Sequence, residues 1–133
     1  MKYILIVILF LPILLNAQSR VYHTTSVKIG VWDNSEGTVN YTYQRKMYKT
    51  VIINKRESYV KIISTEYGNN TFKINDYKTD GNTDRVSITL ECIDDQNDSC
   101  RVLIFLYPLT QTASITIAYA KGAVLKYEMI PDN

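Results

Sequence analysis

Residues 86–108 read VSITLECIDDQNDSCRVLIFLYP, and this stretch decides the fold that the sequence predicts. Apolar and polar residues alternate on both sides of a polar loop, which is typical of two β-strands joined as a hairpin. If Cys92 is set opposite Cys100, Leu90 faces Val102, and all four side chains share one face of the pair. A slip of one residue would turn this apolar set to the other face, so the pattern specifies the register.

The two strands of this hairpin differ on their other face. The first strand carries Ser87, Thr89 and Glu91 there, whereas the second carries Leu103 and Phe105 among others. A strand that is apolar on both faces is typical of an inner position that is covered on both sides. The second strand is therefore expected to lie inside the fold.

Cys92 and Cys100 are the two cysteines of the chain, and the hairpin register places them face to face. Cysteines at directly opposed positions are close enough to form a disulfide without backbone movement. The alternative is a pair of reduced thiols that act as small core residues. The cellular compartment decides between the two, because disulfides persist outside the cytoplasm.

Residues 1–17 have the features of a secretory signal peptide. Lys2 gives a positive start, residues 3–15 are apolar, and Ala17 is a small residue at a polar junction. The apolar run is too short to cross a bilayer as a helix. We therefore expect cleavage after Ala17, an exported protein in the periplasm or outside the cell, and a Cys92–Cys100 disulfide. No stable membrane insertion is expected after cleavage.

Residues 18–133 are expected to form a single all-β domain. A composition of 46% apolar and 21% charged residues excludes wholesale disorder. Residues 18–25 are interpreted as a polar lead-in and residues 78–84 as the longest polar loop. Further strands are predicted at residues 26–32, 38–44, 51–53, 58–67, 71–77, 114–119 and 123–130. About eight short strands with turns between them indicate an antiparallel, meander-like β-sandwich or small β-barrel.

The sequence offers no clear catalytic, cofactor or metal site. The loop at residues 94–99 is acidic, but it lacks the glycine and terminal glutamate of an EF-hand calcium loop, so we interpret it as a solvated turn. The one histidine, His23, falls in the polar lead-in, which leaves a Ser-His-Asp arrangement without a candidate. No pair of carboxylates is singled out by its spacing.

Two features could bind a partner. Residues 41–56 mix Tyr41 and Tyr43, expected on one strand face, with several lysines and arginines, a combination that can bind single-stranded nucleic acid. Export and a formal net charge of only +2 argue against nucleic acid and favour bases that protect a strand edge. Trp32, the one tryptophan, is a candidate anchor for a protein or sugar, although a core position is the more ordinary role.

Three features resemble a loose group of small exported bacterial all-β proteins. They are the sequence VWD at residues 31–33, the segment CIDDQNDSC at residues 92–100 and a tyrosine-containing last strand. The resemblance implies a fold and attaches no function; a likeness to small periplasmic inhibitor barrels is also one of fold alone. We therefore expect a non-catalytic binding protein with a protein, small-molecule or glycan partner. The alternatives are a periplasmic inhibitor or immunity-type protein, and a small carboxylate-dependent hydrolase.

Overall fold

The computed structural model describes residues 19–64 and 68–132, which form nine antiparallel β-strands and no helix. The strands are β1 (Arg20–Asp33), β2 (Thr38–Lys46), β3 (Thr50–Asn54), β4 (Tyr59–Ser64), β5 (Gly68–Gly81), β6 (Val86–Ile93), β7 (Ser99–Tyr107), β8 (Thr112–Tyr119) and β9 (Ala123–Pro131). The predicted signal peptide, residues 1–17, lies outside the described residues. Within them, no helix is long and apolar enough to cross a membrane.

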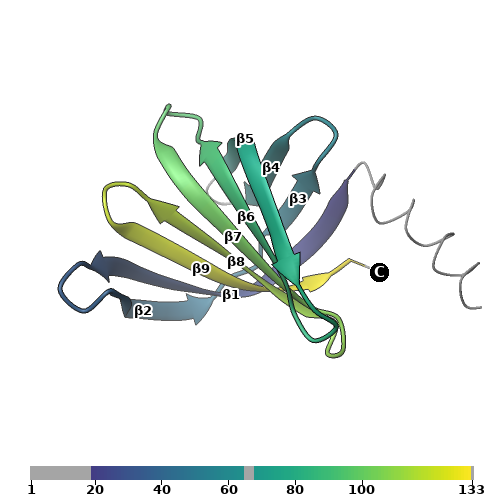
Figure 1. Ribbon diagram of the computed structural model, residues 1–133, viewed down its shortest axis with the longest axis horizontal. Coiled ribbons are helices and arrows are strands. Elements are labelled where there is room, and N and C mark those ends of the chain that lie inside the picture. The colour runs from purple at the N-terminus through teal and green to yellow at the C-terminus, as the bar shows by residue number, and fades with distance from the viewer. Residues whose placement is uncertain (1–18, 65–67, 133) are drawn as a thin grey trace, which may run out of the picture.

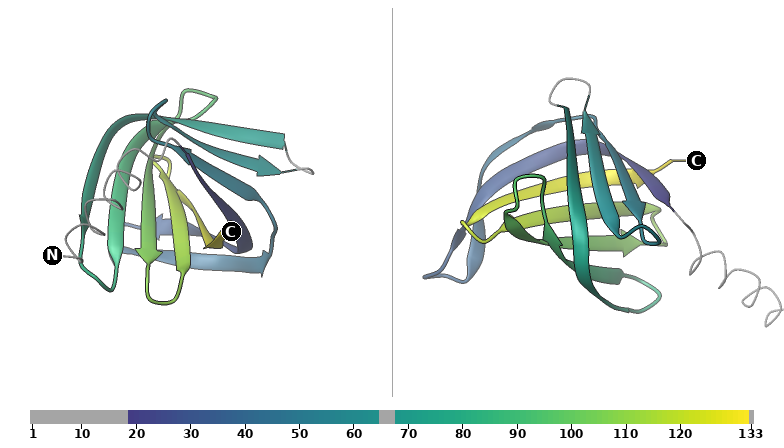
Figure 2. Two further views of the ribbon diagram at one scale, coloured as in Figure 1. Left: turned by 90° about the vertical axis from the view of Figure 1, so that its right-hand side faces the viewer. Right: turned by 90° about the horizontal axis from the view of Figure 1, so that it is seen from above.

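The sheet closes into a barrel because β1 is long and is paired along both of its edges. One edge of β1 pairs with β9, which joins the last strand to the first, and the other edge pairs with β3 near Arg20. Eight strands, all but β2, thus run around a common axis (Figure 1; Figure 2, left). Of the two architectures that the sequence allowed, the structure has the barrel.

The strand β2 pairs only with the second half of β1, on the edge away from β9, so it extends the sheet beyond the barrel; this β1–β2 hairpin is called the arm below (Figure 1). Thr24 holds the corner where the chain passes from β2 to β3. Its buried hydroxyl donates to the Met47 carbonyl at 2.7 Å and accepts the Lys49 N–H, also at 2.7 Å. A buried hydroxyl needs such partners, since leaving it unpaired costs free energy. The corner therefore directs β2 and β3 along the same edge of β1.

The barrel interior is filled by the inward faces of the strands. The fully buried side chains include Phe72, Ile104, Ile115 and Ile117, which come from β5, β7 and β8. The predicted hairpin register is confirmed, with Cys92 opposite Cys100 and Leu90 opposite Val102. The predicted register of the last two strands is confirmed as well, with Ile117 opposite Leu125.

The predicted disulfide is not formed in the structure, where Cys92 and Cys100 are both free and buried thiols. Burial raises the pKa of Cys92 to about 12 and that of Cys100 to about 11, and nearby negative charges add to the shift. Because the thiolate is the form that attacks a disulfide, both groups exchange slowly at neutral pH. The register that would permit the bridge is present, but the bond is not.

Two predicted loops are wrong at their borders. The supposed lead-in is strand from Arg20 onward, and His23 pairs with Thr50 on one side and with Ile130 on the other. The supposed loop at residues 78–84 is strand as far as Gly81. Both segments are rich in polar residues, which are exposed at His23, Lys78 and Asp80 but buried at Thr24, so the apolar alternation of a strand is weak although the backbone pairs with neighbouring strands.

The predicted shared face of Tyr41 and Tyr43 is also wrong. The register between β1 and β2 shifts by one residue, so that Gly30 lies opposite Tyr41 but Ile29 lies opposite Tyr43. Thr42 is the extra residue of this β-bulge, which turns the two tyrosines to opposite faces. Both rings are partly exposed, and neither belongs to the core.

Candidate functional site

The candidate site is a groove on the outer face of the barrel, where apolar side chains of neighbouring strands meet. Leu103 on β7 lies directly opposite Thr116 on β8, and Ala118 on β8 lies opposite Val124 on β9. These four residues point outward, because the residues between them in the sequence fill the interior. Val124 is nonetheless only 2% exposed, so another part of the chain covers it.

The β1–β2 arm borders the groove here, because Trp32 and Val39 line it together with Val124. Gly30 allows β2 to come close to β1. A Cβ atom at Gly30 would lie 2.6 Å from the carbonyl oxygen of Asn40 on β2, nearer than two such atoms can approach. Gly30 lies opposite Val124 in the sheet, and the next outward residue of β1 is Trp32, which lies opposite Val39. The arm thus carries Trp32 and Val39 to the edge of the outer apolar row.

Trp32 is fixed by its backbone and by the turn that follows it. Its N–H donates to the Gly122 carbonyl at 2.8 Å, which ties the arm to the turn between β8 and β9. In the next turn, the Asp33 carboxylate accepts the Ser35 hydroxyl at 2.6 Å and the Ser35 N–H at 2.9 Å. These hydrogen bonds hold the pKa of Asp33 below its usual value. Trp32 is 45% exposed at this position.

The groove has two adjoining parts. One part, of about 320 Å³, lies beside the arm. The other, of about 520 Å³, lies over β6, β7 and β8 and reaches the ends of these strands, where the inward-facing Cys92 and Cys100 also line it. The residues that line both parts are Trp32, Leu103, Ala118, Tyr119 and Ala120. Volumes in this range are typical of ligand-binding clefts, which span about 300–1,000 Å³.

Polar groups at the far end of the groove are paired with each other. Glu91 on β6 lies opposite Arg101 on β7, and the Arg101 Nε donates to the Glu91 carboxylate at 2.7 Å. Asn75 and Ser99 lie nearby along the same wall. The pair leaves this end of the groove without net charge, so it presents hydrogen-bonding groups to a ligand rather than an electrostatic field.

The interior offers much less space. Between the β3–β4 turn and the second half of β5 lies a cavity of about 110 Å³, lined mainly by isoleucines and Leu90. That volume is below the range of clefts that hold drug-sized ligands. A larger ligand would not fit in this cavity.

The acidic loop has structural roles. The Asp94 carboxylate accepts the N–H groups of Gln96 and Asp98 at 2.9 and 2.8 Å, and the Asp95 carboxylate accepts the Thr71 N–H at 3.0 Å. Asp98 lies 3.4 Å from the Lys121 ammonium. In the part of the chain that the structure describes, no group of three or more metal-ligating side chains could hold an ion.

The two other features considered in the sequence are His23 and the segment of bases and aromatic residues at 41–56. His23 lies on β1, where its Nε2 is 3.1 Å from the Asp132 carboxylate on the surface, away from the groove. The bases and aromatic residues of 41–56 do not form one patch. Lys49 points to Tyr127 inside the barrel, with 3.1 Å between its ammonium and the phenol oxygen, whereas Lys55 lies beyond the far end of β3.

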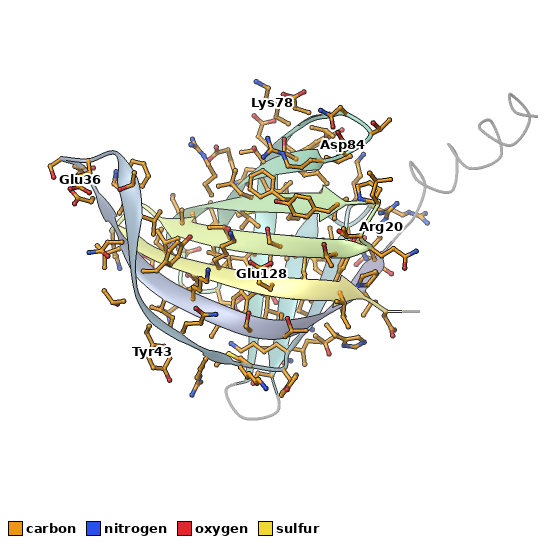
Figure 3. All side chains as sticks on the ribbon, turned by 90° about the horizontal axis from the view of Figure 1, so that it is seen from below. Arg20, Glu36, Tyr43, Lys78, Asp84 and Glu128 are labelled. Atoms are coloured by element: carbon orange, nitrogen blue, oxygen red, sulfur yellow. The ribbon has the colours of Figure 1, made fainter. Side chains whose placement is uncertain are left out.

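The arm itself places its side chains on several sides. Figure 3 shows Arg20 and Glu36 at opposite ends of β1 and its turn, with Tyr43 on β2 directed away from the barrel. Lys28 lies 5.9 Å from the Tyr41 ring centre on one face, and Arg45 lies 6.0 Å from the Tyr43 ring centre on the other. The bases of β2 thus accompany an edge strand, as charged residues on such strands commonly do.

Sequence reasoning named Trp32 but missed the surface beside it. The signal was present in Leu103 and its outward neighbours on the second hairpin strand, and it was interpreted as a sign of burial on both faces. A scan against protein-family models, a search of curated proteins and a search of solved structures each returned no match.

Proposed function

We propose that this chain is an exported, non-catalytic binding protein, and that its partner binds in the groove beside Trp32. The observation that carries the proposal is the groove itself, an apolar surface with an indole that is 45% exposed on a fixed backbone. Tryptophan is enriched among the residues that dominate binding energies. The partner is a protein segment or a glycan that lays an apolar face on Leu103 and Ala118.

The arrangement of carboxylates supports binding over hydrolysis. Glu91 is the carboxylate that lines the groove, and it is held in the ion pair with Arg101. A hydrolase of the paired-carboxylate type needs a second carboxyl group on the other side of the substrate, and one of raised pKa to act as the acid. Asp33, near the arm, has a lowered pKa, which is the opposite shift.

The test compares three baits, which are the wild-type protein, Trp32→Ala and a Tyr48→Ala control. Tyr48 is 77% exposed and lies outside the groove. Each bait is incubated with an extract of the source's own periplasm and with a panel of immobilised glycans, and every hit is purified and titrated. We expect Trp32→Ala to lower affinity by about 30-fold and Tyr48→Ala to leave it unchanged.

Equal binding by all three baits would refute the groove as the site. The identity of a confirmed protein partner also separates the alternatives, because an inhibitor or immunity protein must abolish an activity of the partner it binds. Turnover of a glycan by the wild-type protein, lost on Glu91→Gln, would refute the non-catalytic assignment.

A further inference from the structure

The barrel wall is split between β4 and the second half of β5. The pairing of these strands runs from Ser64 opposite Gly68 to Tyr59 opposite Lys73. One more hydrogen bond follows, in which the Ile74 N–H donates to the Ser58 carbonyl at 2.8 Å. Beyond it, β5 continues to Gly81 with β6 as its partner, and no strand from residues 19–64 or 68–132 pairs with its other side (Figure 1).

The free edge of β5 is capped by its own side chains. The Tyr77 N–H donates to the Asp76 carboxylate at 2.9 Å, and the Gly81 N–H donates to the Asp80 carboxylate at 2.8 Å. Carboxylates on a free edge oppose the addition of another strand. We conclude that the split is not a docking place for a peptide strand.

What the split does open is the interior cavity of about 110 Å³. Its floor is aliphatic, and Leu90 and Ile104 there are almost fully buried. Tyr77 and Thr79 stand on the β5 side of the mouth, because the bulge between Ile74 and Asp76 turns them inward opposite the apolar residues of β6. A cavity with such an aliphatic floor favours the uptake of apolar groups.

The rim of the mouth is cationic. Lys55, from the β3–β4 turn, lines the cavity together with Ser58, and its ammonium lies 5.1 Å from the centre of the Tyr77 ring. This contact spans the split where backbone pairing has ended. The lining residues include one ammonium and the hydroxyls of Ser58 and Thr79, but no carboxylate. Asp76, the nearest acid along β5, has its carboxylate on the Tyr77 N–H.

An aliphatic floor beneath a rim of hydrogen-bond donors fits a ligand with an apolar tail and a hydrogen-bond-accepting head group. We propose that this cavity binds a short-chain alkyl carboxylate, with the alkyl tail in the cavity and the carboxylate on the Lys55 ammonium. The cavity is somewhat smaller than one of about 150 Å³ that accommodates benzene, which limits the tail to roughly three to five carbons. This site is separate from the Trp32 groove, and either can exist without the other.

The proposal is tested by titrating the protein with sodium pentanoate while the isoleucine and leucine methyl signals are followed by NMR. Pentan-1-ol and pentylammonium serve as neutral and cationic probes of the same length. We expect pentanoate to shift the signals of Ile74, Ile88, Leu90 and Ile104 to saturation, with an affinity about tenfold above that of either probe. Equal affinity for pentanoate and pentan-1-ol, or no shift of these signals, would overturn it.

Substitutions test the two halves of the site, the Lys55 ammonium and the aliphatic floor, one at a time. Lys55→Met keeps the aliphatic stem and should weaken pentanoate about tenfold while leaving pentan-1-ol unchanged. Lys73→Met, an exposed lysine on the same β5 strand and absent from the cavity lining, is the matched control and should change neither. Ile88→Phe fills the cavity and should abolish binding of both. If that variant does not fold, Thr79→Leu blocks the mouth instead, and undiminished binding by it would contradict the site.

Discussion

The two faces of β7 have similar side chains and opposite roles. Val102 and Ile104 point inward and have no measurable exposure, whereas Leu103 and Phe105 point outward and are only half-buried. The inner side chains are enclosed by strands from around the barrel. The outer ones are covered only in part: Leu103 lines the groove beside the arm, and the Arg85 guanidinium lies 5.1 Å from the centre of the Phe105 ring. The same apolar alternation thus stabilises the fold on one face and leaves a partly exposed apolar surface on the other.

The largest expected effect is on stability, and it distinguishes the inner face of β7 from its outer face. Ile104→Ala should lower the free energy of unfolding by about 2–5 kcal/mol, since it removes a fully buried side chain and enlarges the interior cavity that Ile104 lines. Leu103→Ala, one residue away, should lower it by less, about 1 kcal/mol, because that side chain is only partly buried. Urea denaturation of both variants measures the difference. Losses of equal size would show that the outer face is part of the core.

The next effect concerns the inward-facing thiols. Oxidising Cys92 and Cys100 to a disulfide should stabilise the protein by about 2.5 kcal/mol in the chain-entropy model, less any strain. Their directly opposed positions make the bond geometrically accessible. Intact mass with and without reductant establishes the redox state, and denaturation of both forms gives the difference. A Cys92→Ala/Cys100→Ala variant is the control and should show no dependence on reductant.

Gly30 connects the outer face to the arm. Gly30→Ala should cost about 1–3 kcal/mol and displace β2, because the new methyl group would meet the Asn40 carbonyl at 2.6 Å. Gly37 is the matched glycine at the arm's turn; it has a positive φ of 68°, and a Cβ there would meet no atom within 4 Å. Gly37→Ala should cost about 1 kcal/mol from its backbone conformation alone. Only Gly30→Ala is expected to change the fluorescence of Trp32.

The smallest expected effect is a loss of stability in alkaline solution, which is absent at neutral pH. In the unfolded chain the thiols ionise near pH 9, but in the folded protein burial holds the pKa of Cys92 near 12 and that of Cys100 near 11. The thiol contribution is therefore fully present below pH 9 and is lost as the pH rises toward 12, because the unfolded state releases protons first. Denaturation between pH 8 and pH 11 measures it.

The double alanine variant is the control for this pH dependence as well. It should flatten the decline and leave the part that is due to Tyr119, whose burial raises its pKa to about 12. A decline unchanged by the double substitution would show that the thiols do not contribute to it.

Much of the fold could be predicted from local patterns. The hairpins of β6–β7 and β8–β9 were placed in the correct register, because alternation and a short turn leave one pairing that buries the apolar residues. Strands with polar side chains were missed where backbone hydrogen bonds to neighbouring strands hold them in the sheet, as at His23 and at residues 78–81. The bulge at Thr42 was missed because a single extra residue changes the faces without leaving a mark in composition.

Of the residues that form the candidate site, only one was predicted from the sequence. Trp32 was named as a possible anchor, but its neighbours Leu103, Ala118 and Val124 come from three other strands. Their proximity depends on barrel closure and on the bend of the arm at Gly30. The interior cavity depends in the same way on the unequal lengths of β4 and β5, which no local pattern encodes.

The sequence by itself determined the strands with alternating residues, the antiparallel hairpins and the opposition of Cys92 and Cys100, because each follows from the period of two along a strand. Only the tertiary structure decided that the sheet closes into a barrel and that β2 projects as an arm. It also decided which of the two apolar faces of β7 is the core. The physical reason is that alternation specifies a residue's face but not what covers that face, and the cover comes from segments distant in the chain.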